Sequence, residues 1–370
     1  MIERSAQRPD MKKEILKLMY RTKAFEAFRL ANSRKALILH YHRFSPSARP
    51  SATAVSVLKE QLAYLTGRYE IVPLAVIVDC LARGAALPRR AAAITVDDGY
   101  RDFYELALPL LERFKVPATV FVVAEFVDRN VWLWTDKVRY LLRRAGPGLA
   151  TELVSQLTGK LRATQRFRKT PSPEYAGSLE AQVATLDLPV LDERAISEAA
   201  DGTNSVLKTF PMVEREAIVA ELASRVGVIL PEHPPDDYEA LSWEELREVA
   251  GSGIDIGSHS MTHPILTLES DQRLRYELRE SKSKIERLTG RAVTLFCYPN
   301  GDYDKRTMLE TERAGYVGAV TCRPGLNSVA ENPFELRRIH TNDDLPHFLQ
   351  STSGLEQLRH TISYRDDRFA

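Results

Sequence analysis

The feature that most constrains the fold is a regular alternation of short apolar segments with helical patterns. Seven runs rich in β-branched and other apolar residues lie at 37–42, 92–96, 118–123, 254–258, 294–298, 317–322 and 336–340. Most are continuously apolar, as expected for strands buried on both faces of a parallel sheet. Helical patterns separate many of them, at about 55–65, 103–113, 270–289, 304–314 and 345–359. The alternation predicts an α/β fold with about seven parallel strands, arranged as a barrel or as an open sheet.

Residues 131–240 interrupt this alternation. They contain few strand signals, and their helical patterns lie at 136–144, 149–161, 178–185 and 212–227. We therefore predict a mostly helical insertion over 131–240. It would separate two parts of one α/β domain, 37–130 and 241–360, with a tail over 361–370.

The N-terminal segment carries most of the net charge. The chain has 51 Lys and Arg against 50 Asp and Glu, a net charge of +1, whereas residues 1–36 alone hold ten basic and four acidic side chains. A balanced total lacks the basic excess typical of nucleic-acid binders, so we expect no nucleic-acid partner. Over 11–30, apolar and basic residues alternate as in an amphipathic helix. Such a helix lies on an anionic membrane surface or docks on the protein's own core, and both alternatives stay open.

The sequence shows no transmembrane or secretory segment. No run approaches the roughly 18–20 apolar residues of a transmembrane helix, and no apolar region follows the basic N-terminus as in a signal peptide. The three cysteines, Cys80, Cys297 and Cys322, are widely spaced and match neither a disulfide framework nor a zinc finger. We expect a cytoplasmic protein, with peripheral contact at the inner membrane face as the open alternative.

Three polar segments follow apolar runs, where strands are expected to end. The first contains the adjacent carboxylates Asp97 and Asp98, the second contains His259 and His263, and the third is the turn 299–301. Taken alone, each has an ordinary structural explanation, such as a turn or a pair of surface histidines. However, the carboxyl ends of the strands of a barrel meet on one face, where catalytic residues gather. The coincidence therefore predicts a metal site for hydrolysis, built from one aspartate and two histidines.

Together these segments resemble the NodB-homology polysaccharide deacetylases, which are carbohydrate esterase family four. The similarity covers roughly 37–130 and 240–345, and it is carried by 95–100, 259–263 and 298–301. The resemblance implies a distorted (β/α) barrel of about seven strands with a divalent metal, most often zinc. It also implies an enzyme that hydrolyses the N-acetyl group of an amino sugar and releases acetate and a free amine.

The resemblance assigns roles to the four residues of the first two segments. Asp98, His259 and His263 would bind the metal, and Asp97 would act as the general base on the attacking water. A bound metal shifts the pKa of water from 15.7 toward about 7, which provides a nucleophile at neutral pH.

Two departures from the family pattern concern the partners of the base. Cys297 stands where many members have an arginine that holds the base carboxylate, and Arg338, at another strand end, is the candidate replacement. The resemblance also implies a histidine as general acid, and the candidates are His42 and His340. Each of them is equally well explained as a structural histidine.

Other residues are candidates for substrate contact. Tyr298 and Asn300 belong to the segment 298–301, and the resemblance implies that the backbone N–H near Asn300 would bind the oxyanion. Trp134, close to Trp132, would stack on a sugar ring or belong to the core. The basic run 160–169 would bind a phosphate of an activated sugar or simply face water.

The expected substrate is an N-acetylated carbohydrate, either a polysaccharide or a lipid-linked glycan intermediate. Two alternatives stay open. One is a deformylase or deacetylase of a small amino sugar. The other is a non-catalytic carbohydrate-binding barrel, which the missing motif arginine favours and the intact carboxylates and histidines oppose.

Overall fold

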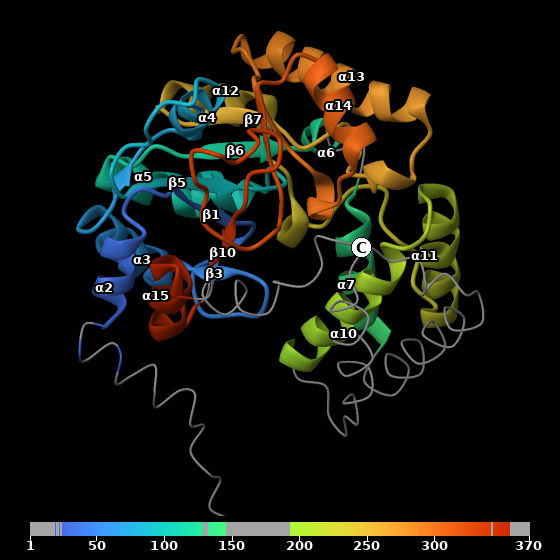
Figure 1. Cartoon of the computed structure of the whole chain (residues 1–370). Coiled ribbons are helices and arrows are strands. Elements are labelled where there is room, and N and C mark those ends of the chain that lie inside the picture. The colour runs from blue at the N-terminus through green and yellow to red at the C-terminus, as the bar shows by residue number, and fades with distance from the viewer. Residues whose placement is uncertain are drawn as a thin grey trace, which may run out of the picture.

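The structure, a computed structural model, describes residues 24–128, 132–145, 193–341 and 343–355, together with Met19 and Thr22. A parallel sheet forms the centre of the larger part of the molecule, with helices around it (Figure 1). Three helices of the predicted insertion stand together beside this part (Figure 1).

All seven predicted strands are present in the sheet. They are β1 (Leu37–Tyr41), β5 (Ala91–Val96), β6 (Thr119–Val122), β7 (Asp255–Ser258), β8 (Leu295–Cys297), β9 (Gly318–Val320) and β10 (Ile339–His340). Their order is β10-β1-β5-β6-β7-β8-β9, and every neighbouring pair is parallel. An unpredicted short strand, β4 (Glu70–Ile71), pairs with the start of β5. The short strands β2 (Phe44–Ser45) and β3 (Thr53–Ala54) form a separate parallel pair.

The two edges of the sheet meet through the segment that leads into β10. Val320 of β9 and Leu336 form a parallel bridge, and the N–H of Thr321 donates to the carbonyl of Leu336 at 2.9 Å. On its other side β10 pairs with β1, where His40 and His340 lie in register. The sheet therefore curls into the distorted (β/α) barrel that the resemblance implies, which confirms the predicted fold class.

The helices around the barrel follow the predicted pattern with two exceptions. The predicted stretches correspond to α3 (Val55–Thr66), α5 (Leu108–Phe114), α13 (Asp271–Thr289), α14 (Lys305–Arg313) and α15 (Leu345–Ser353). A π-helical segment, Phe103–Ala107, precedes α5 where one continuous helix was expected. Helix α4 (Leu74–Ala82) was not predicted, because its apolar residues are almost continuous and show no helical period. Two further short helices are α6 (Ala124–Val127) and α12 (Trp243–Gly251), and short 3₁₀ segments lie at Asp236–Tyr238, Leu266–Leu268 and Pro299–Gly301.

The described part of the predicted insertion is helical and has an apolar core of its own. Helices α7 (Trp134–Ala145), α10 (Glu193–Leu207) and α11 (Met212–Val226) pack together through this core. Helix α10 was not predicted. The helices predicted at 149–161 and 178–185, and the basic run 160–169, lie outside the described residues. The limits of the insertion stay a prediction.

Only the end of the predicted N-terminal helix is described, as α2 (Ala24–Ala31). Phe25 and Arg29 are buried, and the side chain of Asn32, just after the helix, donates to the carbonyl of Ser353 in α15. This end is thus docked on the protein. None of the described helices has the length and apolar character needed to cross a bilayer.

Candidate metal centre and catalytic cleft

A cleft of about 690 Å³ lies between the carboxyl ends of the barrel strands and helices α7 and α10. The barrel side contributes His42, Asn300 and His340, and the helical side contributes Arg139 and Asn204. The strand ends and the insertion therefore share one polar cavity. Its position is the one where barrel enzymes carry their active sites.

Asp97 lies directly after β5, and its side chain is buried beside Arg338. Nη1 of Arg338 donates to Oδ1 of Asp97 and Nη2 donates to Oδ2, each at 2.7 Å. Burial alone would raise the pKa of Asp97. The charge and hydrogen bonds of Arg338 outweigh burial and hold the pKa well below its usual range. The carboxylate is therefore ionised at neutral pH.

Arg338 is itself fixed by the surrounding strands. Its Nε donates to the carbonyl of Thr321 at 2.8 Å, its Nη1 to Oγ1 of Thr95 at 3.0 Å, and its Nη2 to Sγ of Cys297 at 3.2 Å. The small Cys297 side chain thus contacts the guanidinium at the place where the family pattern has its arginine. Arg338 thus makes the contact with the Asp97 carboxylate that is expected of a replacement arginine. The part of Arg338 in catalysis stays a prediction.

Asp98, His259 and His263 converge beside this ion pair. Oδ1 of Asp98 lies 3.5 Å from Nε2 of His259 and 3.6 Å from Nε2 of His263. All three side chains are buried. One ligand atom from each lies within 4.8 Å of the others, close enough for one metal ion.

The protonation of this group suits a cation. Nδ1 of His259 lies 2.7 Å from the carbonyl oxygen of Cys297, which only accepts, so Nδ1 carries the proton and Nε2 presents its lone pair. Burial lowers the pKa of both histidines, which keeps them neutral. Burial and the Asp97 charge raise the pKa of Asp98, so a bound cation would take the place of a proton on this carboxyl group. A carboxylate and two neutral imidazoles are a donor set typical of zinc. The residues present therefore fit the divalent metal that the resemblance implies.

The loops that carry these residues adopt uncommon backbone conformations. Asp98, Ser260, His263 and Asn300 have φ values of 74°, 72°, 58° and 57°, in the left-handed region. Such conformations are rare outside glycine and cluster at functional sites. Gly257 is required for a different reason, because a Cβ there would lie 2.4 Å from the ring of Phe121.

Glu277 of α13, which the sequence did not single out, fixes the loop between the two histidines. Its buried carboxylate accepts hydrogen bonds from the backbone N–H groups of Met261 and Thr262 at 2.8 and 2.9 Å. Arg273 lies 2.7 Å from the same carboxylate. A lone glutamate within a helix gives no sequence signal, because its role depends on a loop that is close only in the fold.

The two candidates for the general acid occupy different positions. Nε2 of His42 lies 3.7 Å from Oδ2 of Asp97, and the side chain is 37% exposed where it lines the cleft. Although part of the side chain is open to the cleft, desolvation by the surrounding protein lowers the pKa of His42 to about 4, and the Asp97 carboxylate only partly opposes this shift. His340 also lines the cleft, and its ring centroid is 6.3 Å from that of His42. Of these two histidines, His42 is the one that forms a contact with Asp97.

Asn300 and Tyr298, expected to contact substrate together, face different surroundings. Asn300 lines the cleft, and its Nδ2 is buried without a hydrogen-bond partner in the part of the chain that the structure describes. The ring of Tyr298 is fully buried and stacks on Tyr303, and its N–H donates to the carbonyl of Val320. Tyr298 was expected to contact the substrate, but its side chain is part of the barrel core.

Trp134 was a candidate for stacking on a sugar ring, but the structure shows its ring in a core. Its ring is 3% exposed, belongs to the core formed by α7, α10 and α11, and lies under the guanidinium of Arg215 at 4.5 Å. Trp132 is buried as well and packs on Tyr140. A ring enclosed in this way has no open face for stacking on a sugar, so the core alternative fits both tryptophans.

Comparison with known sequences identifies one family over much of the chain. A family model for polysaccharide deacetylases matches residues 84–156 and 203–319, more than half of the chain. The chain is also 30% identical over 102 residues to YxkH of Bacillus subtilis (28% of this chain, 37% of that protein). It is 39% identical over 74 residues to the poly-β-1,6-N-acetyl-D-glucosamine N-deacetylase of Escherichia coli (20% of this chain, 11% of that protein). It thus spans well under half the length of these relatives.

Two solved structures share the fold over most of both chains. The first is the Streptococcus pyogenes deacetylase PplD in complex with acetate, with a TM-score of 0.53 and 16% identity over 86% of this chain and 98% of that one. The second is IcaB from Ammonifex degensii, with a TM-score of 0.53 and 18% identity over 87% and 97% of the two chains. At these identities the similarity establishes the fold alone.

Proposed function

Because this chain belongs to the polysaccharide deacetylase family, we propose that it is a metal-dependent hydrolase that removes N-acetyl groups from amino sugars of a glycan. The observation that carries the proposal is the pairing of two preformed, buried groups beside His42, which lines the cleft and lies 3.7 Å from Asp97. The ionised Asp97 is held by Arg338, and the ligand set of Asp98, His259 and His263 lies beside it. A binding-only barrel would not need a buried carboxylate kept ionised next to a metal site.

Asp97 would take a proton from the water that attacks the carbonyl carbon of the acetamide. The bidentate contact with Arg338 orients the carboxylate and keeps it ionised between turnovers. A divalent metal, most suitably zinc, would polarise the acetamide carbonyl and lower the pKa of the attacking water. The depressed pKa makes Asp97 a weak base. The metal would lower the pKa of the attacking water and bring it closer to that of Asp97, so that the proton transfer becomes feasible.

His42 would supply the proton that the departing nitrogen needs. Its low pKa makes the free imidazole neutral at pH 7, so it has to gain a proton during the reaction. The 3.7 Å separation from Asp97 offers a short route for the proton taken from water. One water is then consumed, acetate leaves, and the amine keeps one hydrogen more than the amide had.

Asn300 would stabilise the negative charge that develops on the acetamide oxygen. Its Nδ2 is a buried donor without a partner in the described part of the chain, and Asn300 lines the cleft, so a small rotation of the side chain would direct this donor toward the substrate oxygen. This replaces the earlier expectation for Tyr298, whose N–H and side chain are both engaged in the barrel.

The substrate test compares acetate release from several N-acetylated compounds. We expect the purified chain with zinc to deacetylate oligosaccharides of N-acetylglucosamine, including β-1,6-linked and lipid-linked forms, faster than the free monosaccharide, because the cleft is large enough for more than one sugar unit. Formate release from N-formylated analogues would reveal the alternative activity. Binding of oligosaccharide without release of any acid would contradict the proposed function.

The two candidate acids can be separated by substitution. We expect His42→Gln to lower kcat for acetate release by about 10²- to 10⁴-fold, the usual contribution of a general acid. His340→Gln should lower it by less than about 10-fold, because His340 has no contact with Asp97 among the described hydrogen bonds and ion pairs. The assay is run at one equivalent of zinc, and a larger loss in His340→Gln than in His42→Gln would reverse the assignment.

A further inference from the structure

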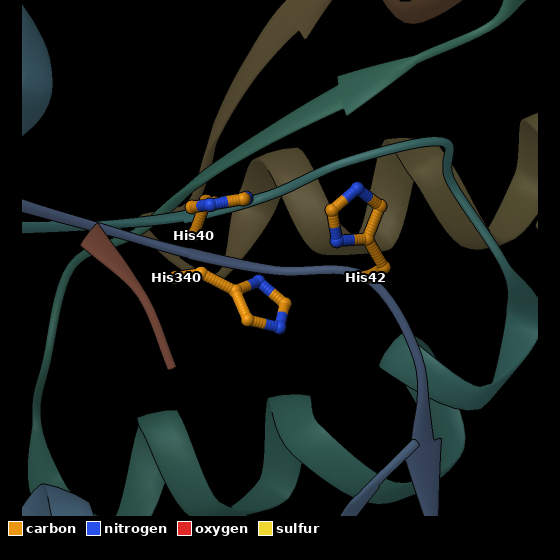
Figure 2. Close-up of side chains that lie close together, drawn as sticks. All are labelled: His40, His42 and His340. Carbon is orange, nitrogen blue, oxygen red and sulfur yellow. The ribbon is translucent and has the colours of Figure 1, made fainter. Parts of the chain in front are cut away.

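Three histidines gather at the rim of the barrel, outside the ligand set described above. His40 and His340 lie in register on the adjacent parallel strands β1 and β10, so their side chains leave the same face of the sheet. His42 follows His40 by two residues and leaves the same face. Figure 2 shows the three imidazole rings close together, and their planes are tilted relative to one another.

The spacing of the rings suits a shared ligand. The centroid of the His40 ring lies 5.4 Å from that of His42 and 4.9 Å from that of His340. One ring nitrogen from each of the three residues lies within 4.8 Å of the others. In a tetrahedral zinc site with Zn–N bonds near 2.0–2.1 Å, ligand nitrogens are about 3.4 Å apart. Small rotations of the three side chains would bring their ring nitrogens to this separation.

His40 provides an independent indication that something is bound here. Its side chain is 6% exposed, and its Nδ1 has no hydrogen-bond partner within the described ranges. An unpaired polar atom at such a buried position costs free energy, and a bound ion would remove this cost. A neutral imidazole nitrogen is also the commonest protein ligand for transition metals.

We propose that His40, His42 and His340 form a second, weaker metal site for a divalent transition ion such as zinc, and that occupancy of this site inhibits the enzyme. Three imidazoles suit zinc, copper or nickel rather than magnesium or calcium. The cluster contains no carboxylate, unlike the group around Asp98, so the Asp98 site fills first. His42 and His340 line the cleft, which gives the ion a path from solvent.

The nearby charges permit a cation at this position. Arg338 is two residues from His340, but both of its Nη atoms are bound to Asp97, and the pair is neutral overall. Asp343 lines the cleft close to His340. A cation held by the three rings would therefore not face an uncompensated guanidinium.

Occupancy would remove His42 from catalysis, because the ion would occupy the one lone pair with which a neutral imidazole accepts a proton. Activity should then rise with the first equivalent of zinc and fall as a second one binds. The binding itself does not depend on the proposed function, whereas its inhibitory effect rests on it.

The test is equilibrium dialysis of the metal-depleted full chain against rising free Zn²⁺, with zinc counted by elemental analysis and acetate release measured on the same samples. We expect wild type to bind one zinc more than His40→Phe at high free zinc. Inhibition by excess zinc should be absent in His40→Phe, whose activity at the first equivalent should match wild type. His347→Phe is the matched control, since His347 lies on α15 beside Asp344, and it should behave as wild type.

The outcomes separate this site from the proposed function. Equal zinc counts and equal inhibition in wild type and His40→Phe would overturn the second site. Loss of one zinc in His40→Phe without acetate release from wild type would support the site and contradict the proposed function. If His40→Phe fails to fold by circular dichroism, His340→Gln at the exposed end of β10 should show the same loss of one zinc, and an unchanged count there would overturn the proposal.

Discussion

Replacing Asp97 by asparagine is expected to lower the rate of acetate release by about 10²- to 10⁴-fold while zinc binding is retained. Asparagine keeps the size of the side chain but cannot accept a proton from water. The three proposed metal ligands are other residues, so the metal content should not change. The measurement pairs acetate release with elemental analysis of zinc at one equivalent.

The same substitution should lower stability, and this effect has its own control. Arg338 would remain buried without its charge partner, which typically costs about 3–5 kcal/mol in the free energy of unfolding. The double variant Asp97→Asn, Arg338→Met removes both charges and should regain much of that stability. Because it still lacks the base, it should stay inactive. Activity within 10-fold of wild type in Asp97→Asn would contradict the role of Asp97.

Most of the barrel could be predicted from the sequence because its strands are buried on both faces. A short continuous apolar run such as 92–96 is typical of a strand buried on both faces, and all of its residues lie in β5 and are buried. Elements with weak patterns escaped prediction. Helix α4 is nearly all apolar, and β4 has only two residues, too few for any periodicity.

The convergence of the three candidate metal ligands could be predicted because they follow strand ends, where the topology of a parallel barrel brings them together. The supporting contacts could not. Glu277 reaches the His259–His263 loop from the middle of α13, and nothing in its local sequence marks that contact. Asn300 was expected through its turn, but it is its side-chain amide that is left unpartnered at the cleft.

The roles of residues in the insertion were the hardest to predict, because the sequence does not distinguish an apolar or aromatic residue of a core from one of a binding surface. Trp134 fits both until its neighbours are known, and the structure encloses it among α7, α10 and α11. The cleft shows what these helices contribute instead. Arg139 of α7 and Asn204 of α10 line it opposite the strand ends, so the insertion shapes the wall that a glycan would contact.

Replacing His263 by alanine is expected to abolish zinc binding at low free zinc and to reduce acetate release to the level of the metal-depleted enzyme. The group contains three protein ligands, and the loss of one leaves only Asp98 and His259, too few for a tight zinc site. Without the metal, the attacking water keeps a pKa near 15.7 and the reaction loses its nucleophile at neutral pH.

The control for His263→Ala has to separate metal loss from misfolding, since His263 is buried in a loop with a left-handed backbone conformation. Chelation of wild type followed by return of one equivalent of zinc should restore acetate release, whereas the same treatment of a folded His263→Ala should not. His347→Ala, remote from the loop on α15, should bind zinc and release acetate as wild type does. Zinc is kept at or below one equivalent so that the three-histidine cluster stays empty. A full zinc complement in His263→Ala would remove His263 from the ligand set, and full activity of the chelated wild type would exclude metal dependence itself.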